Sequence, residues 1–165
     1  MIVTVPEAEP LVGDWRMRHT QDAPAGIPPH VTVLFPFVPS EGAGEAVERV
    51  AELVAAEPAF DLAFRRTARF PVVLYLDPEP AAPFLALTAA ISDEWPEHPP
   101  YEGAHETVIP HLTVAESDDS ALLDRIAGEV EPRLPLEKRV TEASLFVESD
   151  TGRWHEHSRF PLGGP

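Results

Sequence analysis

The sequence contains no cysteine, a single lysine and no long apolar run. Without cysteine, disulfides, thiolate metal sites and a cysteine nucleophile are excluded. A membrane helix needs about 18 consecutive apolar residues, so we expect no membrane partner. The first residues lack a basic segment followed by a long apolar one, so no signal peptide is predicted and a cytoplasmic location is expected.

Positive charge is scarce as well. The 165 residues include 12 lysines and arginines against 28 aspartates and glutamates, a net charge of −16. A surface of this sign repels polyanions, so extended tracking along a nucleic acid is not expected. A small anionic substrate, or only the end of an oligonucleotide, is compatible with this charge if a local basic cleft exists. Eleven of the 12 basic residues are arginine, the side chain best suited to bind phosphate.

The pattern of apolar residues predicts many short elements, and the 20 prolines argue against long helices. Strands are expected at 2–5, 30–35, 60–65, 72–76, 107–115, 134–148 with a break near Glu142, and 154–162. Helices are expected at 9–18, at 40–56 with Ser40 as N-cap, at 80–94, and from Ser117 to Val130. Loops are expected at 20–29 and 95–103, and turns at 77–80 and 150–152.

The order strand, helix, strand, strand occurs twice, once after His30 and again after His111. Two copies indicate an internal duplication, with halves at 27–76 and 107–162. The strand at 1–5 and the helix at 80–94 complete the lobes. We therefore predict one two-lobed α+β domain over 1–165, with pseudo-twofold symmetry. Two antiparallel sheets should face a central cleft, with the helices packed outside.

The two copies begin with matching motifs, Pro-His-Val-Thr-Val at 29–33 and Pro-His-Leu-Thr-Val at 110–114. A lone His-x-Thr arises easily by chance, but the longer pattern found twice at the head of the same element order does not. Residues i and i+2 of a strand project from the same face. His30 should therefore lie beside Thr32, and His111 beside Thr113.

Two imidazoles and two hydroxyls around one small space suit phosphoryl transfer. A neutral histidine can accept a proton from the attacking group while a protonated histidine donates one to the leaving oxygen. The hydroxyls of Thr32 and Thr113 can donate to the non-bridging oxygens, where transition-state charge accumulates. We therefore expect catalysis by His30, Thr32, His111 and Thr113 without a metal or another cofactor.

Segments 30–37 and 110–114 resemble the two signatures of the two-histidine phosphoesterase superfamily, and most closely its bacterial 2′-5′ RNA ligase-like and cyclic phosphodiesterase branch. The resemblance implies a LigT-like bilobal fold. It also implies hydrolysis of 2′,3′-cyclic phosphates to 2′-phosphates, or reversible 2′-5′ ligation of RNA ends. His30 and Thr32 would form one half of the site, with His30 as acid. His111 and Thr113 would form the other half, with His111 as base, and the direction of the reaction exchanges the roles.

Three functions follow as hypotheses. The first is a monomeric hydrolase of cyclic phosphodiesters, whose partner is a nucleotide, an RNA terminus or another small cyclic phosphodiester. The second is a 2′-5′ RNA ligase, which the missing basic character disfavours. The third is a non-catalytic module that binds a nucleotide.

Further residues are candidates for substrate binding. Arg16 and Arg65 could bind phosphate, although a solvated face is the alternative for each. Phe37 and Tyr101 could stack a base, although core or rim packing is the alternative. The segment 6–29 could form a lid over the cleft.

The other histidines carry weaker signals. His155 and His157 could pair on a metal, but a solvated strand face is favoured because no third ligand is evident. His98 and His105 flank a proline-rich loop and are expected at the surface.

Overall fold

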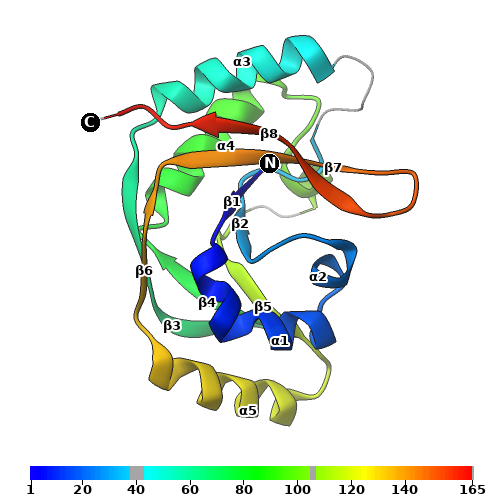
Figure 1. The fold of residues 1–165 in the computed structure, drawn as a ribbon, viewed down its shortest axis with the longest axis vertical. Coiled ribbons are helices and arrows are strands. Elements are labelled where there is room, and N and C mark those ends of the chain that lie inside the picture. The colour runs from blue at the N-terminus through cyan, green and yellow to red at the C-terminus, as the bar shows by residue number, and fades with distance from the viewer. Residues whose placement is uncertain (38–42, 105–106, 165) are drawn as a thin grey trace.

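The computed structural model describes residues 1–37, 43–104 and 107–164, and the strands among them form two four-stranded antiparallel sheets. One sheet has the order β2-β1-β7-β8 and the other the order β5-β4-β3-β6 (Figure 1). This arrangement confirms the α+β fold with two antiparallel sheets. The strands are β1 Ile2–Thr4, β2 His30–Thr32, β3 Phe60–Phe70, β4 Val73–Glu79, β5 Leu112–Glu116, β6 Leu136–Val140, β7 Glu142–Glu148 and β8 Trp154–Pro161.

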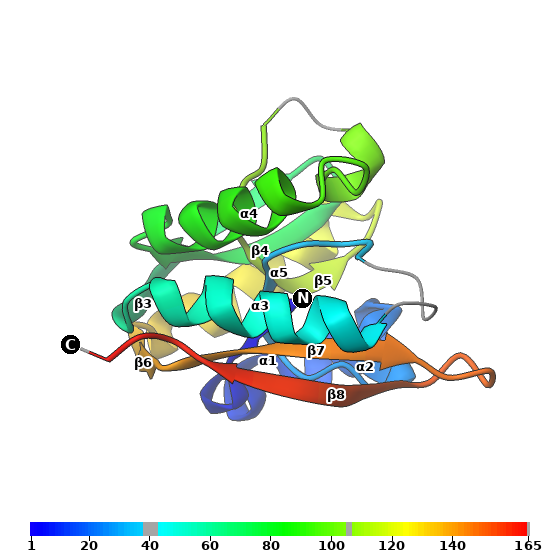
Figure 2. The ribbon, with the colours of Figure 1, turned by 90° about the horizontal axis from the view of Figure 1, so that it is seen from above.

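Five α-helices and three short 3₁₀ helices are found in this part of the chain. Helix α3 packs against strand β8 and helix α4, whereas α5 lies beside α1 and β4 (Figures 1 and 2). None of the described helices is long and apolar enough to span a membrane. The helices are α1 Glu9–His19, α2 Asp22–Ala25, α3 Ala43–Ala56, α4 Ala82–Glu94 and α5 Ser120–Val130, and the 3₁₀ helices are η1 Pro6–Ala8, η2 Pro100–Gly103 and η3 Glu131–Arg133.

Helix α5 begins later than expected, and of the residues predicted to form its buried face (Leu122, Ile126 and Val130), Leu122 is only partly buried, whereas the adjacent Leu123 is buried. Ile126 and Val130 are buried in the core. The N-cap is Asp119, whose carboxylate accepts from the backbone N–H groups of Ala121 and Leu122 at 3.0 and 3.2 Å. The predicted cap, Ser117, instead accepts from the N–H of Asp119. Several side-chain acceptors are available in segment 117–120, and the carboxylate of Asp119 caps the N-terminus, where negative charge is favoured.

Strand β4 continues through the predicted turn at 77–80. Its partner β5 pairs only with residues from Val73 to Leu76, whereas β3 pairs as far as Glu79. Pro78 therefore lies where β4 has a neighbour on one side only, a position that tolerates a residue without an N–H. Strand β4 is an inner strand of its sheet, as predicted for 72–76, but it begins at Val73, and Val72 before it is 43% exposed.

Other boundaries also differ from the prediction. The expected loop at 20–29 contains the short helix α2, β2 ends at Thr32, and β3 continues to Phe70. Strand β5 begins one residue after His111. The predicted cap Ser40 and the predicted surface residue His105 lie outside the described residues.

The topology brings the two motifs together. Strand β2 is the outer strand of one sheet and β5 is the outer strand of the other, and the two strands contact each other. Strands β3 and β4, which follow the first motif, belong to the sheet of the second motif. Strands β7 and β8, which follow the second motif, belong to the sheet of the first. Each motif therefore lies at the sheet edge nearest the other.

Candidate active site

A cavity of about 610 Å³ lies where the two sheets meet, and all four residues of the repeated motifs line it. His30 and Thr32 come from β2, Thr113 from β5, and His111 from the residue just before β5. The rest of the wall consists of Met1, Ile2, Gln21, Asp22, Ala25, Ile27, Leu34, Phe35, Tyr101, Glu116, Phe146, Glu148, Gly152 and Trp154. We call this cavity the histidine cleft.

His30 is fixed by a backbone hydrogen bond. Its Nδ1 lies 2.8 Å from the carbonyl oxygen of Pro28 and 3.9 Å from Oδ2 of Asp22. The side chain is 12% exposed. Burial lowers the pKa of His30 to about 4, and the nearby Arg16 guanidinium acts in the same direction. The bond to Pro28 and the Asp22 carboxylate raise this pKa, but burial outweighs them.

His111 repeats this arrangement in the second motif. Its Nδ1 lies 2.8 Å from the carbonyl oxygen of Ile109. The rings of Phe70 and Tyr75 pack beside the imidazole, with centroids 5.1 and 5.4 Å away. Burial lowers the pKa of His111, while the bond to Ile109 and the Glu116 carboxylate raise it.

These hydrogen bonds determine which ring nitrogen is available. A carbonyl oxygen can only accept, so Nδ1 of each histidine carries the proton and donates it. The neutral imidazole then has its lone pair on Nε2, the nitrogen left for the cleft. In both motifs a proline, Pro29 or Pro110, lies between the carbonyl and the histidine, and its ring fixes the φ angle there. This gives the motif proline a physical role in placing the imidazole.

The threonines are partly buried on the same wall, and Tyr101 lies beside one of them. Burial raises the pKa of the Tyr101 hydroxyl, and a hydrogen bond with Thr32 opposes this shift. The backbone N–H of Tyr101 donates to the carbonyl of Phe35 at 2.7 Å. Tyr101 and Glu102 have φ angles of 52° and 55°, in the left-handed region that is unfavourable for residues with a side chain. The surrounding contacts hold this strained turn at the cleft.

The predicted base-stacking residue Phe37 lies next to the histidine cleft, but not on its wall. Its ring packs edge-on against Trp95, with centroids 5.3 Å apart and an interplanar angle of 82°. Phe37 lines a neighbouring cavity of about 460 Å³. The sequence could not distinguish this packing from base stacking, because Trp95 is distant in the chain.

Arg16 does not reach the cleft. It is 1% exposed, and its Nη2 donates to Oδ2 of Asp22 at 2.8 Å and to the carbonyl of Ile27 at 3.2 Å. Asp22 also accepts a hydrogen bond from the hydroxyl of Thr20. Arg16 therefore ties α1 to the α2 segment that precedes His30. Arg16 does not line the cleft, but its guanidinium lies near enough to His30 to lower the pKa of that imidazole.

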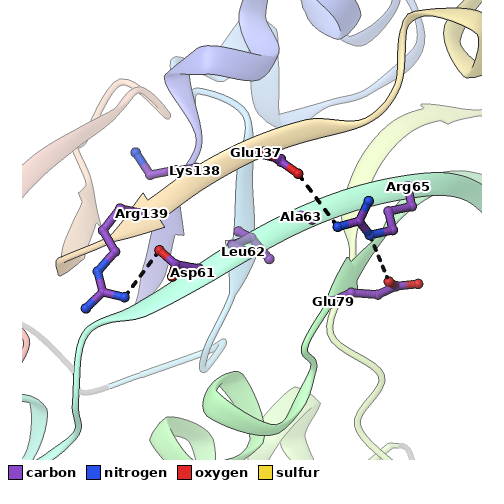
Figure 3. A pocket seen from close by; sticks show the side chains of 8 residues that line it. All are labelled: Asp61, Leu62, Ala63, Arg65, Glu79, Glu137, Lys138 and Arg139. Atoms are coloured by element: carbon purple, nitrogen blue, oxygen red, sulfur yellow. Dashed lines mark ion pairs between the residues drawn. The ribbon is translucent and has the colours of Figure 1, made fainter.

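Arg65 faces a different part of the surface. It pairs with Glu79 of β4 at 3.5 Å and with Glu137 of β6 at 3.6 Å. These residues line a cavity of about 510 Å³ that shares no lining residue with the histidine cleft (Figure 3). The neighbouring strands each present a glutamate to Arg65, so its charge is compensated before any ligand binds.

His155 and His157 lie on β8, on either side of Glu156. Glu156, between them, accepts hydrogen bonds from Ser144 and Arg159. Across the described parts of the chain, no three histidine or carboxylate side chains are grouped to hold a metal ion.

Several residues of the cleft were not predicted. Asp22, Glu116 and Glu148 place carboxylates on its wall, and Trp154 adds an aromatic side chain. Asp22 lies in a segment whose sequence shows no periodic pattern of apolar residues. Glu116 and Glu148 are the last residues of strands, where charged residues are common and do not indicate a site. A weak signal existed only for Glu116, which lies three residues after Thr113 of the second motif.

Comparison with known proteins places the chain in a family. The model of the 2′-5′ RNA ligase superfamily matches residues 4–152. The chain belongs to the 2′-5′ RNA ligase superfamily. No curated protein matches the chain.

Solved structures show the same fold at low sequence identity. E. coli LigT complexed with NADP⁺ has a TM-score of 0.59 and 21% identity over 98% of this chain and 94% of LigT. TT0787 of Thermus thermophilus has a TM-score of 0.63 and 21% identity over 99% and 96% of the two chains. E. coli LigT complexed with 3′-AMP has a TM-score of 0.57 and 20% identity over 98% and 94%. These likenesses confirm the LigT-like fold.

Proposed function

We propose that the protein is a metal-independent phosphodiesterase that opens 2′,3′-cyclic phosphodiesters, or similar cyclic ones, of nucleotides or RNA ends. The observation that carries this proposal is the matched placement of His30 and His111 in one cleft. Each Nδ1 is held by a backbone carbonyl, which leaves two Nε2 atoms for proton transfer. The fold relatives support a nucleotide substrate, because LigT was crystallised with 3′-AMP and with ATP.

In the proposed reaction, water attacks phosphorus and the bond from phosphorus to the 3′ oxygen breaks. One Nε2 accepts the proton of the attacking water, and the other histidine donates its Nε2 proton to the leaving oxygen. The product is a 2′-phosphate, and the two histidines have exchanged protonation states. Thr32 and Thr113 donate to the non-bridging oxygens, and Tyr101 orients Thr32.

The surroundings of the two histidines differ, and this difference favours one assignment of roles. Burial lowers the pKa of His30 to about 4 despite the nearby Asp22 carboxylate, whereas the Glu116 carboxylate opposes the lowering at His111. In the proposed reaction His30 is thus the histidine more readily neutral and free to accept a proton, and His111 the one more readily protonated and able to donate one. This is the reverse of the assignment that the resemblance implies.

The direct test is turnover of nucleoside 2′,3′-cyclic monophosphates in the presence of a chelator. Wild type should release a nucleoside 2′-phosphate, and His30→Ala and His111→Ala should each be roughly 10²–10⁴-fold slower. His155→Ala, which changes an exposed histidine of β8, is the matched control and should retain the wild-type rate.

Two results would contradict the proposal. One is wild-type turnover that the chelator abolishes and a divalent metal restores. The other is turnover that survives both cleft replacements. Nucleotide binding without turnover by the wild type would favour the binding module. Joining of RNA ends without hydrolysis would favour the ligase.

A further inference from the structure

The wall of the histidine cleft is acidic. Asp22, Glu116 and Glu148 line it, and no lysine or arginine is found among the described residues that do so. Residues 38–42, 105–106 and 165, which lie outside the description, include no lysine or arginine in the sequence. The local basic cleft that the sequence left open is therefore absent from the described wall.

Most of the scarce cations of the chain are engaged elsewhere. Arg153 lies between two lining residues of the β7–β8 hairpin, but its guanidinium donates to the carbonyl of Pro24 at 3.3 Å. The amino group of Met1 reaches the cleft and donates to the carbonyl of Leu34, and burial lowers its pKa to about 5. The side chains in ion pairs with carboxylates are Arg16, Arg49, Arg65, Arg66, Arg69, Lys138, Arg139 and Arg159.

The three carboxylates of the wall are not equivalent. Asp22 is compensated by its ion pair with the buried Arg16. Glu116 and Glu148 are exposed, and neither pairs with a lysine or arginine of the described chain. Two negative charges of the cleft are thus compensated by no neighbouring lysine or arginine.

The space next to the cleft is apolar. The neighbouring cavity of about 460 Å³ adjoins the histidine cleft, with Met1, Phe35, Phe146, Glu148 and Trp154 lining both. The rest of its wall is mainly apolar and consists of Pro36, Phe37, Ala46, Val47, Val50, Leu145, Val147 and His157, together with the shared Met1. The walls shared with the cleft offer an apolar surface to an uncharged flat group, whereas no lysine or arginine among the described residues lines this neighbouring cavity to pair with a second phosphate.

We infer that the cleft selects substrates whose only negative charge is the reacting phosphodiester, and that it discriminates against nucleotides bearing an additional phosphate. The inference rests on the proposed function for the identity of the reacting group. A second phosphate carries nearly two negative charges at neutral pH. A cavity of about 610 Å³ is on the order of 10 Å across, which keeps that phosphate close to Glu116 and Glu148. At this distance and in a partly hydrated site, repulsion between the second phosphate and the two glutamates should weaken binding of the ligand by about tenfold at low salt.

The experiment compares two ligands, adenosine 2′,3′-cyclic phosphate and the same molecule with a 5′-phosphate. Calorimetry on His111→Ala reads binding apart from turnover, because the proposed chemistry is blocked in that variant. At about 20 mM salt the 5′-phosphorylated ligand should bind about tenfold more weakly. At about 0.5 M salt the difference should shrink to about threefold or less, because repulsion is screened.

Charge-neutralising variants separate repulsion from steric exclusion. Adding Glu148→Gln or Glu116→Gln should each reduce the penalty on the 5′-phosphorylated ligand by about threefold. Glu129→Gln on the exposed side of α5 removes the same charge far from the cleft, and should leave the penalty unchanged.

Equal affinity for both ligands would overturn the inference. The inference would also be overturned if the weaker binding of the 5′-phosphorylated ligand changed neither with salt nor with Glu116→Gln and Glu148→Gln. The additional phosphate would then be excluded sterically rather than by charge. The proposed function fails separately, if wild type does not turn over the cyclic nucleotide while the charge discrimination persists in binding.

Discussion

Replacing His30 by glutamine should remove a pH-dependent part of the stability of the fold. In the native protein, burial lowers the pKa of His30 to about 4, whereas a histidine in the unfolded chain has a pKa of about 6.5. Between about pH 6.5 and pH 4, His30 is therefore protonated in the unfolded state but neutral in the native state. The stabilisation associated with a neutral His30 is complete above pH 6.5 and is lost as the pH falls toward 4. The full loss corresponds to about 3 kcal/mol.

Urea denaturation followed by tryptophan fluorescence measures this loss. Carboxylates titrate in the same range, so the useful quantity is the difference in unfolding free energy between wild type and His30→Gln. Between about pH 7.5 and pH 5, wild type should lose about 2 kcal/mol more than the variant. His155→Gln, at an exposed position on β8, should follow wild type. If the unfolding free energies of wild type and His30→Gln changed equally between about pH 7.5 and pH 5, the reasoning would be refuted, because a buried neutral imidazole makes stability pH-dependent in this range.

Three further predictions concern the cleft and the arginines around it. The proposed reaction needs one protonated imidazole, and burial lowers the pKa of both His30 and His111. We therefore expect kcat/KM to peak below about pH 6.5 and to fall toward pH 8. A pH profile of kcat/KM that is flat from about pH 5 to 9 would contradict this prediction. Arg16→Met removes the arginine that pairs with the carboxylate of Asp22. The free energy of unfolding measured in urea should fall by about 2–4 kcal/mol. An unchanged denaturation midpoint would count against a structural role of the Arg16–Asp22 pair. Arg65→Ala should change kcat/KM by no more than about twofold and the free energy of unfolding by no more than about 0.5 kcal/mol. The reason is that the ion pairs of Arg65 are exposed and lie outside the cleft. A tenfold loss of kcat/KM would instead indicate that Arg65 binds substrate.

The parts of the fold that the sequence predicted are those determined by local periodicity. Alternating apolar residues at 60–64 and the spaced Ile126 and Val130 indicate which faces are buried, and the core contains them. The repeated motif predicted which side chains share a face, and the cavity contains all four. The outer-strand positions of β2 and β5 were not predictable in this way, because strand order depends on pairings between distant segments.

The arginines illustrate the limit of reasoning from residue type. A guanidinium suits phosphate, but it suits a carboxylate equally well. Which partner it meets depends on tertiary structure. Asp22 lies six residues from Arg16, whereas Glu79 and Glu137 reach Arg65 from two other strands. No local pattern separates these outcomes from a phosphate contact.

An acidic protein with an acidic cleft is an unexpected host for phosphodiester chemistry, yet the two features are compatible. Only interactions that are stronger in the transition state than with the bound substrate accelerate the chemical step. A lysine or arginine in the cleft would attract substrate and product alike. In its place the cleft has the hydroxyls of Thr32 and Thr113 and two imidazoles. In the proposed reaction such groups would bind a resting anion weakly and respond to the charge that develops as the ring opens. If Glu116 and Glu148 also repel substrates with additional charge, as inferred above, weak attraction and selectivity would follow from the same placement of charges.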